Sequence, residues 1–268
     1  MDGAAQTAGS GDHVLELGRE DVWEEFPAFT RFSTECLHHG RSMTVRFHLL
    51  DALDAIPEPL KGHVMHELEA ANERIAQLVQ LDRLDIVVTP GDFVIPELGL
   101  NGLAHSPGLI TVTLDPECPR MSDPERPTRI LGMLAHEMHH VMRMRCGAWA
   151  YSLGERLVGE GLAQCFEEEV GAPTPFYVVA LDDRTMKKMA ARARPLLSAT
   201  DYDHNAWMFG RRNDPEWPRN TGYSLGYALV KAWLAERNMS AIAAAGVPAS
   251  EITEDWMSGR LSVFAASG

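Results

Sequence analysis

The stretch that decides the fold runs from Thr128 to Glu169 and contains the run His136-Glu137-Met138-His139-His140. Apolar residues recur around it every three or four positions, at 130, 131, 134, 138, 141 and 142, and no proline or glycine interrupts residues 133–146. This spacing predicts an amphipathic helix that begins near Pro127 and ends near Gly147. On such a helix the first and last histidines of the run lie one turn apart on the same face.

Two imidazoles placed in this way can bind one metal ion, and Glu137 beside them can reach a water on that metal. A second amphipathic segment, residues 151–170, offers a third ligand, because Glu160 is an unusual member of its apolar face. The separation of 20 positions between His140 and Glu160 allows the first helix to end and the chain to return antiparallel. We therefore expect His136, His140 and Glu160 to bind a metal ion, and His139, the second-best ligand, to face away.

An HExxH helix followed by a glutamate on the next helix resembles the gluzincin group of zinc metallopeptidases, which includes the thermolysin-like enzymes. More closely, the segments AHEMHHVMR (135–143), GEGLAQ (159–164) and TGYSLGYALV (221–230) look like a family of predicted zinc-dependent proteases. The segment IPELGLNGLAHSPGLITVTLDP (95–116) looks like the same family, and the likeness covers about residues 84–240. Gln164 departs from the thermolysin-like pattern, which has an aspartate there to hydrogen-bond a ligand histidine.

The resemblance implies a Zn2+ ion bound by the three ligands, a peptide or protein substrate, and Glu137 as the base that activates the metal-bound water. It also implies a small sheet packed against the HExxH helix, with an edge strand that lines the cleft and pairs with substrate backbone. The same two-histidine, one-carboxylate set also forms the Fe2+ site of non-haem oxygenases, which is the alternative. A non-catalytic metal-bound binding protein is a third possibility, although it would not need Glu137.

Peptide hydrolysis also requires a hydrogen-bond donor for the oxyanion. The candidates after the second helix are His204, Arg219, Tyr223 and Tyr227. Because the GYSLGY stretch is a recurring feature of the family that the chain resembles, Tyr223 is the first choice and His204 the second. Both tyrosines could equally be core residues of their helix. The glutamates at 167–169 are interpreted as a solvated run at a helix end.

The remaining pattern predicts an α+β fold: a mainly helical single domain, residues 13–268, with a small β-sheet packed against the HExxH helix, after a disordered tail over 1–12. Residues 84–89 and 109–114 are the predicted strands, a hairpin-like pair joined by a long glycine-rich loop. Helices are expected at 43–55, 60–81, 176–193, 221–237 and 248–257, and a structured loop at 200–220.

Composition narrows the class of protein further. The 268 residues carry a formal net charge of −14, which argues against nucleic acid and anionic membranes as partners. No run of 18 apolar residues and no secretory signal is visible, and the four cysteines are scattered without metal-site spacing. We therefore expect a cytoplasmic protein whose thiols are reduced.

Overall fold

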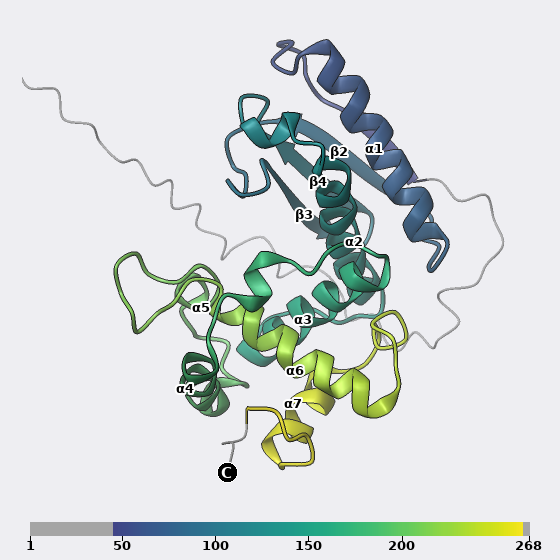
Figure 1. The fold of residues 1–268 in the computed structure, drawn as a ribbon. Coiled ribbons are helices and arrows are strands. Elements are labelled where there is room, and N and C mark those ends of the chain that lie inside the picture. Colours follow the sequence, from purple (N-terminus) through teal and green to yellow (C-terminus); the bar gives the residue numbers. More distant parts are fainter. Residues whose placement is uncertain (1–44, 265–268) are drawn as a thin grey trace, which may run out of the picture. The chain divides into compact units, whose positions relative to one another are not determined.

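The structure is a computed structural model that describes residues 45–264. It is α+β and mainly helical, as predicted, with one four-stranded sheet (Figure 1). The strands are β1 (Val45–Leu49), β2 (Leu84–Pro90), β3 (Leu100–Ser106) and β4 (Leu109–Leu114). They lie in the order β1-β2-β4-β3, in which β1, β2 and β4 are parallel and β3 is an antiparallel edge strand.

Strands β2 and β4 form the centre of this sheet, and buried and partly exposed residues alternate along both. Leu84, Ile86 and Val88 are buried in β2, and every second residue of β4 is buried beside them, while the residues between are partly exposed. The buried face belongs to the main hydrophobic core. Helix α2 packs against β3 and β4, so the sheet lies on the HExxH helix as predicted.

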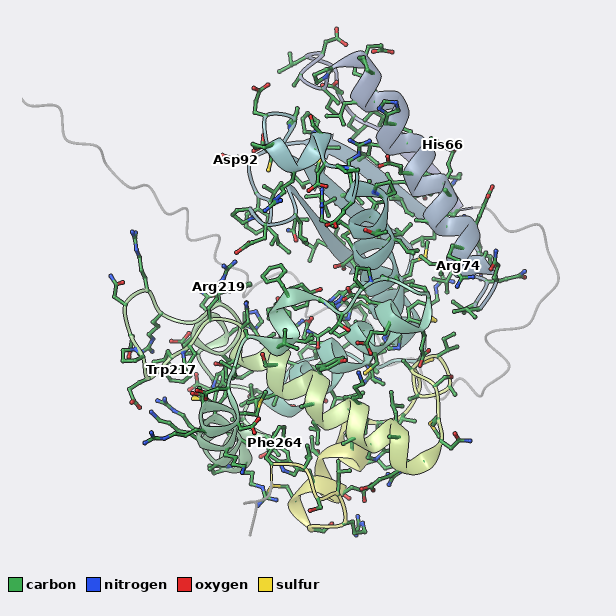
Figure 2. The ribbon with its side chains drawn as sticks, viewed as in Figure 1. His66, Arg74, Asp92, Trp217, Arg219 and Phe264 are labelled. Carbon is green, nitrogen blue, oxygen red and sulfur yellow. The ribbon has the colours of Figure 1, made fainter. Side chains whose placement is uncertain are left out.

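The described residues form seven α-helices, one of which, α2, carries the HExxH segment. They are α1 (Glu58–Ala76), α2 (Arg126–Arg145), α3 (Leu153–Glu169), α4 (Asp183–Ala193), α5 (His204–Phe209), α6 (Thr221–Arg237) and α7 (Ala249–Met257). Helix α1 packs on α2 through one face, while its opposite face carries exposed side chains such as His66 (Figure 2). Helix α3 packs against α2, α6 and α7, which places it at the centre of the helical part.

Two predictions about the first third of the chain are wrong. The expected helix at 43–55 contains strand β1, because Arg46 and His48 pair with Asp85 of β2 and leave the alternate residues facing the core. The expected glycine-rich loop contains strand β3, which forms the hairpin with β4. The two predicted strands, β2 and β4, are therefore parallel neighbours and not a hairpin.

The second half of the chain follows the prediction with small changes. The helix expected at 176–193 is divided into a 3-10 turn, η3 (Phe176–Val179), and α4, whose first turn is capped by Asp182. The expected loop at 200–220 contains the short helix α5. None of the described helices is long and apolar enough to cross a membrane. The tail predicted over residues 1–12 and the domain start at 13 lie outside the described residues.

Candidate metal centre

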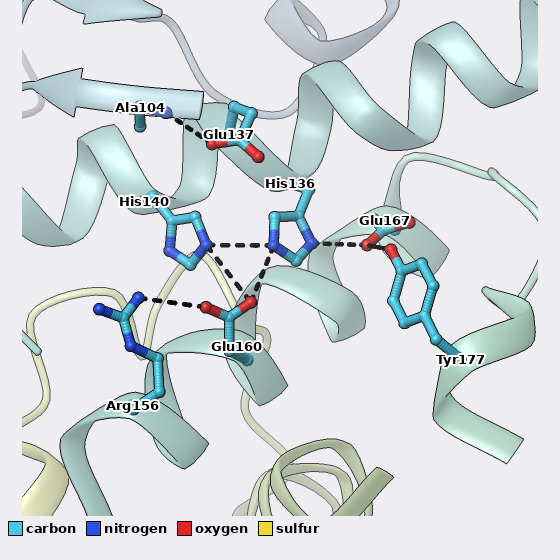
Figure 3. A network of polar contacts seen from close by, with 8 residues as sticks. All are labelled: Ala104, His136, Glu137, His140, Arg156, Glu160, Glu167 and Tyr177. Atoms are coloured by element: carbon cyan, nitrogen blue, oxygen red, sulfur yellow. Dashed lines mark hydrogen bonds and ion pairs between the residues drawn. The ribbon is translucent and has the colours of Figure 1, made fainter. Parts of the chain in front are cut away.

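Helix α2 brings two histidines of the motif together, as their spacing predicts. The Nε2 atoms of His136 and His140 lie 3.1 Å apart, and both rings point away from the sheet (Figure 3). The helix has Pro127 in its first turn, and Gly147, just beyond its end, has a positive φ of 76°. Both features match the expected helix boundaries.

Helix α3 supplies the third group. It begins with a capping box between Ser152 and Glu155 and runs back along α2. Glu160 is buried, and its Oε2 lies 3.1 Å from Nε2 of His136 and 3.6 Å from Nε2 of His140 (Figure 3). The three predicted ligand atoms therefore converge on one point, and they form the group that could hold a metal ion within the described part of the chain.

The spacing of these three atoms fits zinc. A tetrahedral zinc ion with bonds of about 2.0–2.1 Å keeps its ligand atoms about 3.3 Å apart, and the observed separations are 3.1, 3.1 and 3.6 Å. The chemistry of the donors agrees. Since Nδ1 of His136 faces the Glu167 carboxylate at 2.7 Å, a neutral ring carries its proton there and turns the lone pair of Nε2 towards Glu160. In this tautomer the Nε2 lone pair and the Glu160 carboxylate can both bind a metal ion placed between them.

The electrostatics of the site favour such a cation. Burial alone would lower the pKa of His136, but its hydrogen bonds with Glu160 and Glu167 raise that pKa well above the usual value. Burial would likewise raise the pKa of Glu160, yet the two histidines hold it well below the usual range. A buried carboxylate that stays ionised beside two imidazoles attracts positive charge.

Glu167 orients one of the histidines, which corrects the interpretation of residues 167–169 as a solvated run. Its side chain is buried, and its Oε1 accepts hydrogen bonds from His136 Nδ1 at 2.7 Å and from the Tyr177 hydroxyl at 3.0 Å (Figure 3). Gln164, at the aspartate position of thermolysin-like enzymes, is buried, and its amide has no hydrogen-bond partner among the described residues. The support for the histidine thus comes from one turn further along α3.

Glu137 lies on the sheet side of α2. Its Oε2 accepts a 2.7 Å hydrogen bond from the backbone N–H of Ala104 in the edge strand β3 (Figure 3). The close approach of strand and helix depends on Gly102, because a Cβ there would lie 2.5 Å from Cγ of Glu137. The predicted base is therefore held at the junction of the edge strand and the HExxH helix.

The donor candidates divide into two groups. Tyr223 packs against Tyr177, and burial together with the carboxylates of Glu160 and Glu137 raises the pKa of its hydroxyl far above the usual range. No hydrogen bond joins this hydroxyl to another described residue. Burial lowers the pKa of His204. Glu160 acts on the same pKa in the opposite direction, so His204 also lies within electrostatic range of this candidate ligand.

The other two candidates are engaged elsewhere. Arg219 is exposed and pairs with Glu97 at 2.5 Å (Figure 2), and the Tyr227 hydroxyl donates to Glu168 at 2.6 Å. His139 faces away from the candidate metal ligands, as expected: it is fully buried and its Nε2 lies 3.1 Å from the carbonyl oxygen of Ala241.

The sequence was compared with protein families and with curated proteins. Residues 64–254 match a family described as predicted Zn-dependent protease. The chain belongs to this family. No curated protein matches the chain. The matched region includes α2, α3 and α6, so every element that carries a candidate ligand, the predicted base or Tyr223 lies within the family's common region.

Within this family member, sequence reasoning missed Glu167, Tyr177 and the backbone of Ala104. For Glu167 a signal existed, because seven residues make nearly two helical turns and place it on the same face as Glu160. Tyr177 offered no comparable signal, since it lies on a 3-10 turn between two prolines and α4. The Ala104 contact depends on strand β3, which the glycines of its segment concealed.

Proposed function

We propose that this protein is a zinc-dependent peptidase that hydrolyses peptide bonds in a peptide or protein substrate. The observation that carries the proposal is the convergence of two imidazole nitrogens and one carboxylate oxygen, with Glu137, the neighbour of His136 on helix α2, held against the edge strand β3. His136, His140 and Glu160 would hold the zinc ion. Bound there, zinc supplies Lewis-acid chemistry, by polarising the scissile carbonyl and lowering the pKa of a water.

Glu137 is the general base of the proposed reaction. Its carboxylate takes a proton from the attacking water and later delivers it to the leaving nitrogen. The Ala104 N–H binds one oxygen of this carboxylate at 2.7 Å and leaves the other oxygen for the proton transfer. Strand β3 thereby fixes the orientation of the base before substrate binds.

Tyr223 is the oxyanion donor in this proposal, and strand β3 is the substrate-binding edge. Both Glu160 and Glu137 act on the pKa of Tyr223, whereas only Glu160 of these two acts on that of His204. A hydroxyl near enough to both carboxylates to feel their charge is a candidate donor to the oxygen on which negative charge develops. The outer edge of β3 has no strand beside it in the described sheet, so it can pair with an extended peptide.

The test is Glu137→Gln, assayed for both metal and peptide cleavage. The amide is nearly isosteric with the carboxylate but cannot accept the proton, so zinc content should remain at one equivalent while kcat falls by several orders of magnitude. Glu160→Ala serves as the contrasting variant and should lose the metal. Loss of zinc in Glu137→Gln would contradict the base role, and iron with oxygen consumption in the native protein would favour the oxygenase alternative.

A further inference from the structure

The guanidinium of Arg156 lies beside the candidate metal ligands and has unused hydrogen-bonding capacity. It comes from α3, one turn before Glu160, and its Nη1 lies 3.4 Å from Glu160 Oε1. Figure 3 shows it on the opposite side of Glu160 from Tyr177. A firm arginine–carboxylate pair is bidentate, with bonds of about 2.7–2.9 Å. This single long contact therefore does not use the guanidinium fully.

Counting the donors of Arg156 leads to the same result. A guanidinium has five N–H groups, and its partners among the described residues are Glu160 and the Tyr202 side chain. Its Nε is buried without a hydrogen-bond partner. The side chain is nevertheless 32% exposed, compared with 7% for Glu160. A cation that is only partly paired is therefore accessible to a solute.

A row of aromatic rings extends from Arg156 towards Tyr223. The ring centroids of Tyr202 and His204 are 6.1 Å apart, those of His204 and Phe209 6.0 Å, and those of Phe209 and Tyr223 6.4 Å. Phe209 is 55% exposed, and the His204 and Tyr223 rings that it contacts are half-buried. These ring contacts link the neighbourhood of the guanidinium to the proposed oxyanion donor.

We propose that Arg156 binds a carboxylate of the substrate close to the scissile bond, with the aromatic row in contact with that part of the substrate. The planar guanidinium matches a carboxylate in geometry and charge, and its free donors would complete a bidentate pair. The carboxylate is either the C-terminus of a peptide or the side chain of an aspartate or glutamate. This inference rests on the proposed peptidase function.

Direct binding tests the inference without any cleavage. The zinc-loaded protein is titrated calorimetrically with N-acetylphenylalanine and with its amide, which differ only in the carboxylate. We expect the acid to bind at least tenfold more tightly than the amide, and Arg156→Gln to reduce this preference to less than threefold. Arg184→Gln is the matched control, because Arg184 is exposed on α4 and should behave as wild type.

Two outcomes of this titration would overturn the inference. Equal affinity for acid and amide in the wild type would show that no carboxylate site exists. A preference that survives in Arg156→Gln would assign carboxylate binding to the metal ion. Zinc affinity of Arg156→Gln should remain within threefold of wild type, since a tenfold loss would make Arg156 a support for Glu160 and not a substrate contact.

Cleavage assays then distinguish the two sources of the carboxylate. The assay compares kcat/KM for three peptides. The first has a free C-terminus, the second an amidated C-terminus, and the third an amidated C-terminus and an internal glutamate. Preference for the first indicates a carboxypeptidase-like specificity, and preference for the third indicates an acidic side chain. If no peptide is cleaved while the acid still binds through Arg156, the carboxylate site stands and the peptidase function fails.

Discussion

At the scale of single residues, Tyr223 offers a clear test of whether a side chain acts in catalysis or only packs in the core. Tyr223→Phe keeps the ring and its contact with Tyr177 but removes the hydroxyl. Loss of one oxyanion donor costs about 10²–10³ in kcat, and KM should change much less because the bond strengthens only as charge develops. Steady-state kinetics with a fluorogenic peptide measure both constants.

His204→Gln is the competing variant in the same assay. We expect it to retain more activity than Tyr223→Phe, because its imidazole is influenced by Glu160 but not by Glu137. A large kcat loss in His204→Gln with near-normal Tyr223→Phe would transfer the donor role to His204. Near-normal kcat in both variants would leave the role to a backbone amide of strand β3 or to the metal alone.

Tyr177 gives a second prediction, one that depends on metal affinity. Burial and the neighbouring Glu167 raise the pKa of Tyr177 well above its usual value, so its hydroxyl stays protonated and donates to Glu167. That carboxylate in turn orients His136. Removal of such an outer partner weakens metal binding about 10–100-fold, so we expect Tyr177→Phe to weaken zinc binding by about tenfold in competition with a chromogenic chelator.

Tyr227→Phe is the matched control for this measurement. The Tyr227 hydroxyl also donates to a glutamate, Glu168, at 2.6 Å. The other hydrogen-bond partners of Glu168 among the described residues are Thr174 and Lys231, neither of which is a candidate metal ligand. Zinc affinity should therefore be unchanged. Equal affinity in Tyr177→Phe and wild type would mean that Glu167 orients His136 without help from Tyr177.

The sequence predicted that the three candidate ligands come together, because helical spacing alone aligns His136 with His140 and an acidic residue on an apolar face is conspicuous. It did not predict Glu167, because three consecutive glutamates at a helix end resemble a solvated surface. Their environments differ since successive helical residues are about 100° apart. Glu167 turns inward against Gly132, while Glu168 turns towards Lys231.

At the scale of elements, the crossing of α3 and α6 depends on two glycines. A Cβ on Gly161 would lie 2.2 Å from the carbonyl oxygen of Gly226, and a Cβ on Gly226 would lie 2.2 Å from that of Leu157. Gly161→Ala must therefore force the helices apart, at a cost of at least about 1–3 kcal/mol in the free energy of unfolding. Urea denaturation measures this cost.

The same helix offers a control on the other side of Glu160. A Cβ on Gly159 would meet no atom within 4 Å, so Gly159→Ala should be neutral or should stabilise the protein by about 0.4–1 kcal/mol through its helix propensity. Zinc affinity should fall in Gly161→Ala and remain in Gly159→Ala. Equal stability of the two variants would show that the crossing has room for a methyl group.

Prediction of the strands was less successful than prediction of the helices, for a physical reason. Strands β2 and β4 are rich in β-branched residues, which makes them recognisable without any partner. Strands β1 and β3 are at the edges of the sheet, where one side of each strand has no neighbouring strand among residues 45–264. Strand β3 also contains Gly102, which is needed for contact with Glu137 and which weakens a strand pattern.

At the scale of the whole molecule, the α+β class followed from the ratio of helical to strand patterns, whereas the sheet topology did not. Parallel pairing of β1, β2 and β4 joins residues far apart in the sequence, and no local pattern encodes such pairing. The centre of the fold is nevertheless where the motif indicated. Helix α2 contacts the sheet, α1 and α3, so the candidate metal centre lies at the junction of the sheet and the helical part.

Asp255 joins three segments at the C-terminal end of this molecule and provides a test of pH-dependent stability. Its buried carboxylate accepts hydrogen bonds from Arg260 at 2.6 Å, from the Trp233 indole at 3.0 Å and from Arg237. The Arg260 hydrogen bond, together with those of the other two partners, holds the pKa of Asp255 below its usual value of 3.8. Asp255→Asn should cost about 1–3 kcal/mol at neutral pH.

The sign of the pH dependence follows from the direction of this shift. A carboxylate whose pKa is lowered on folding stabilises the native state above its unfolded pKa, about 3.9, and loses that contribution as the pH falls through the folded pKa. The free-energy difference between wild type and Asp255→Asn should therefore be constant from about pH 7 to pH 5 and decrease below about pH 4. Glu254→Gln removes the same charge from the exposed neighbouring residue and should show little difference at any pH. A difference for Asp255→Asn that persists unchanged to pH 3 would mean that shape, and not charge, accounts for its effect.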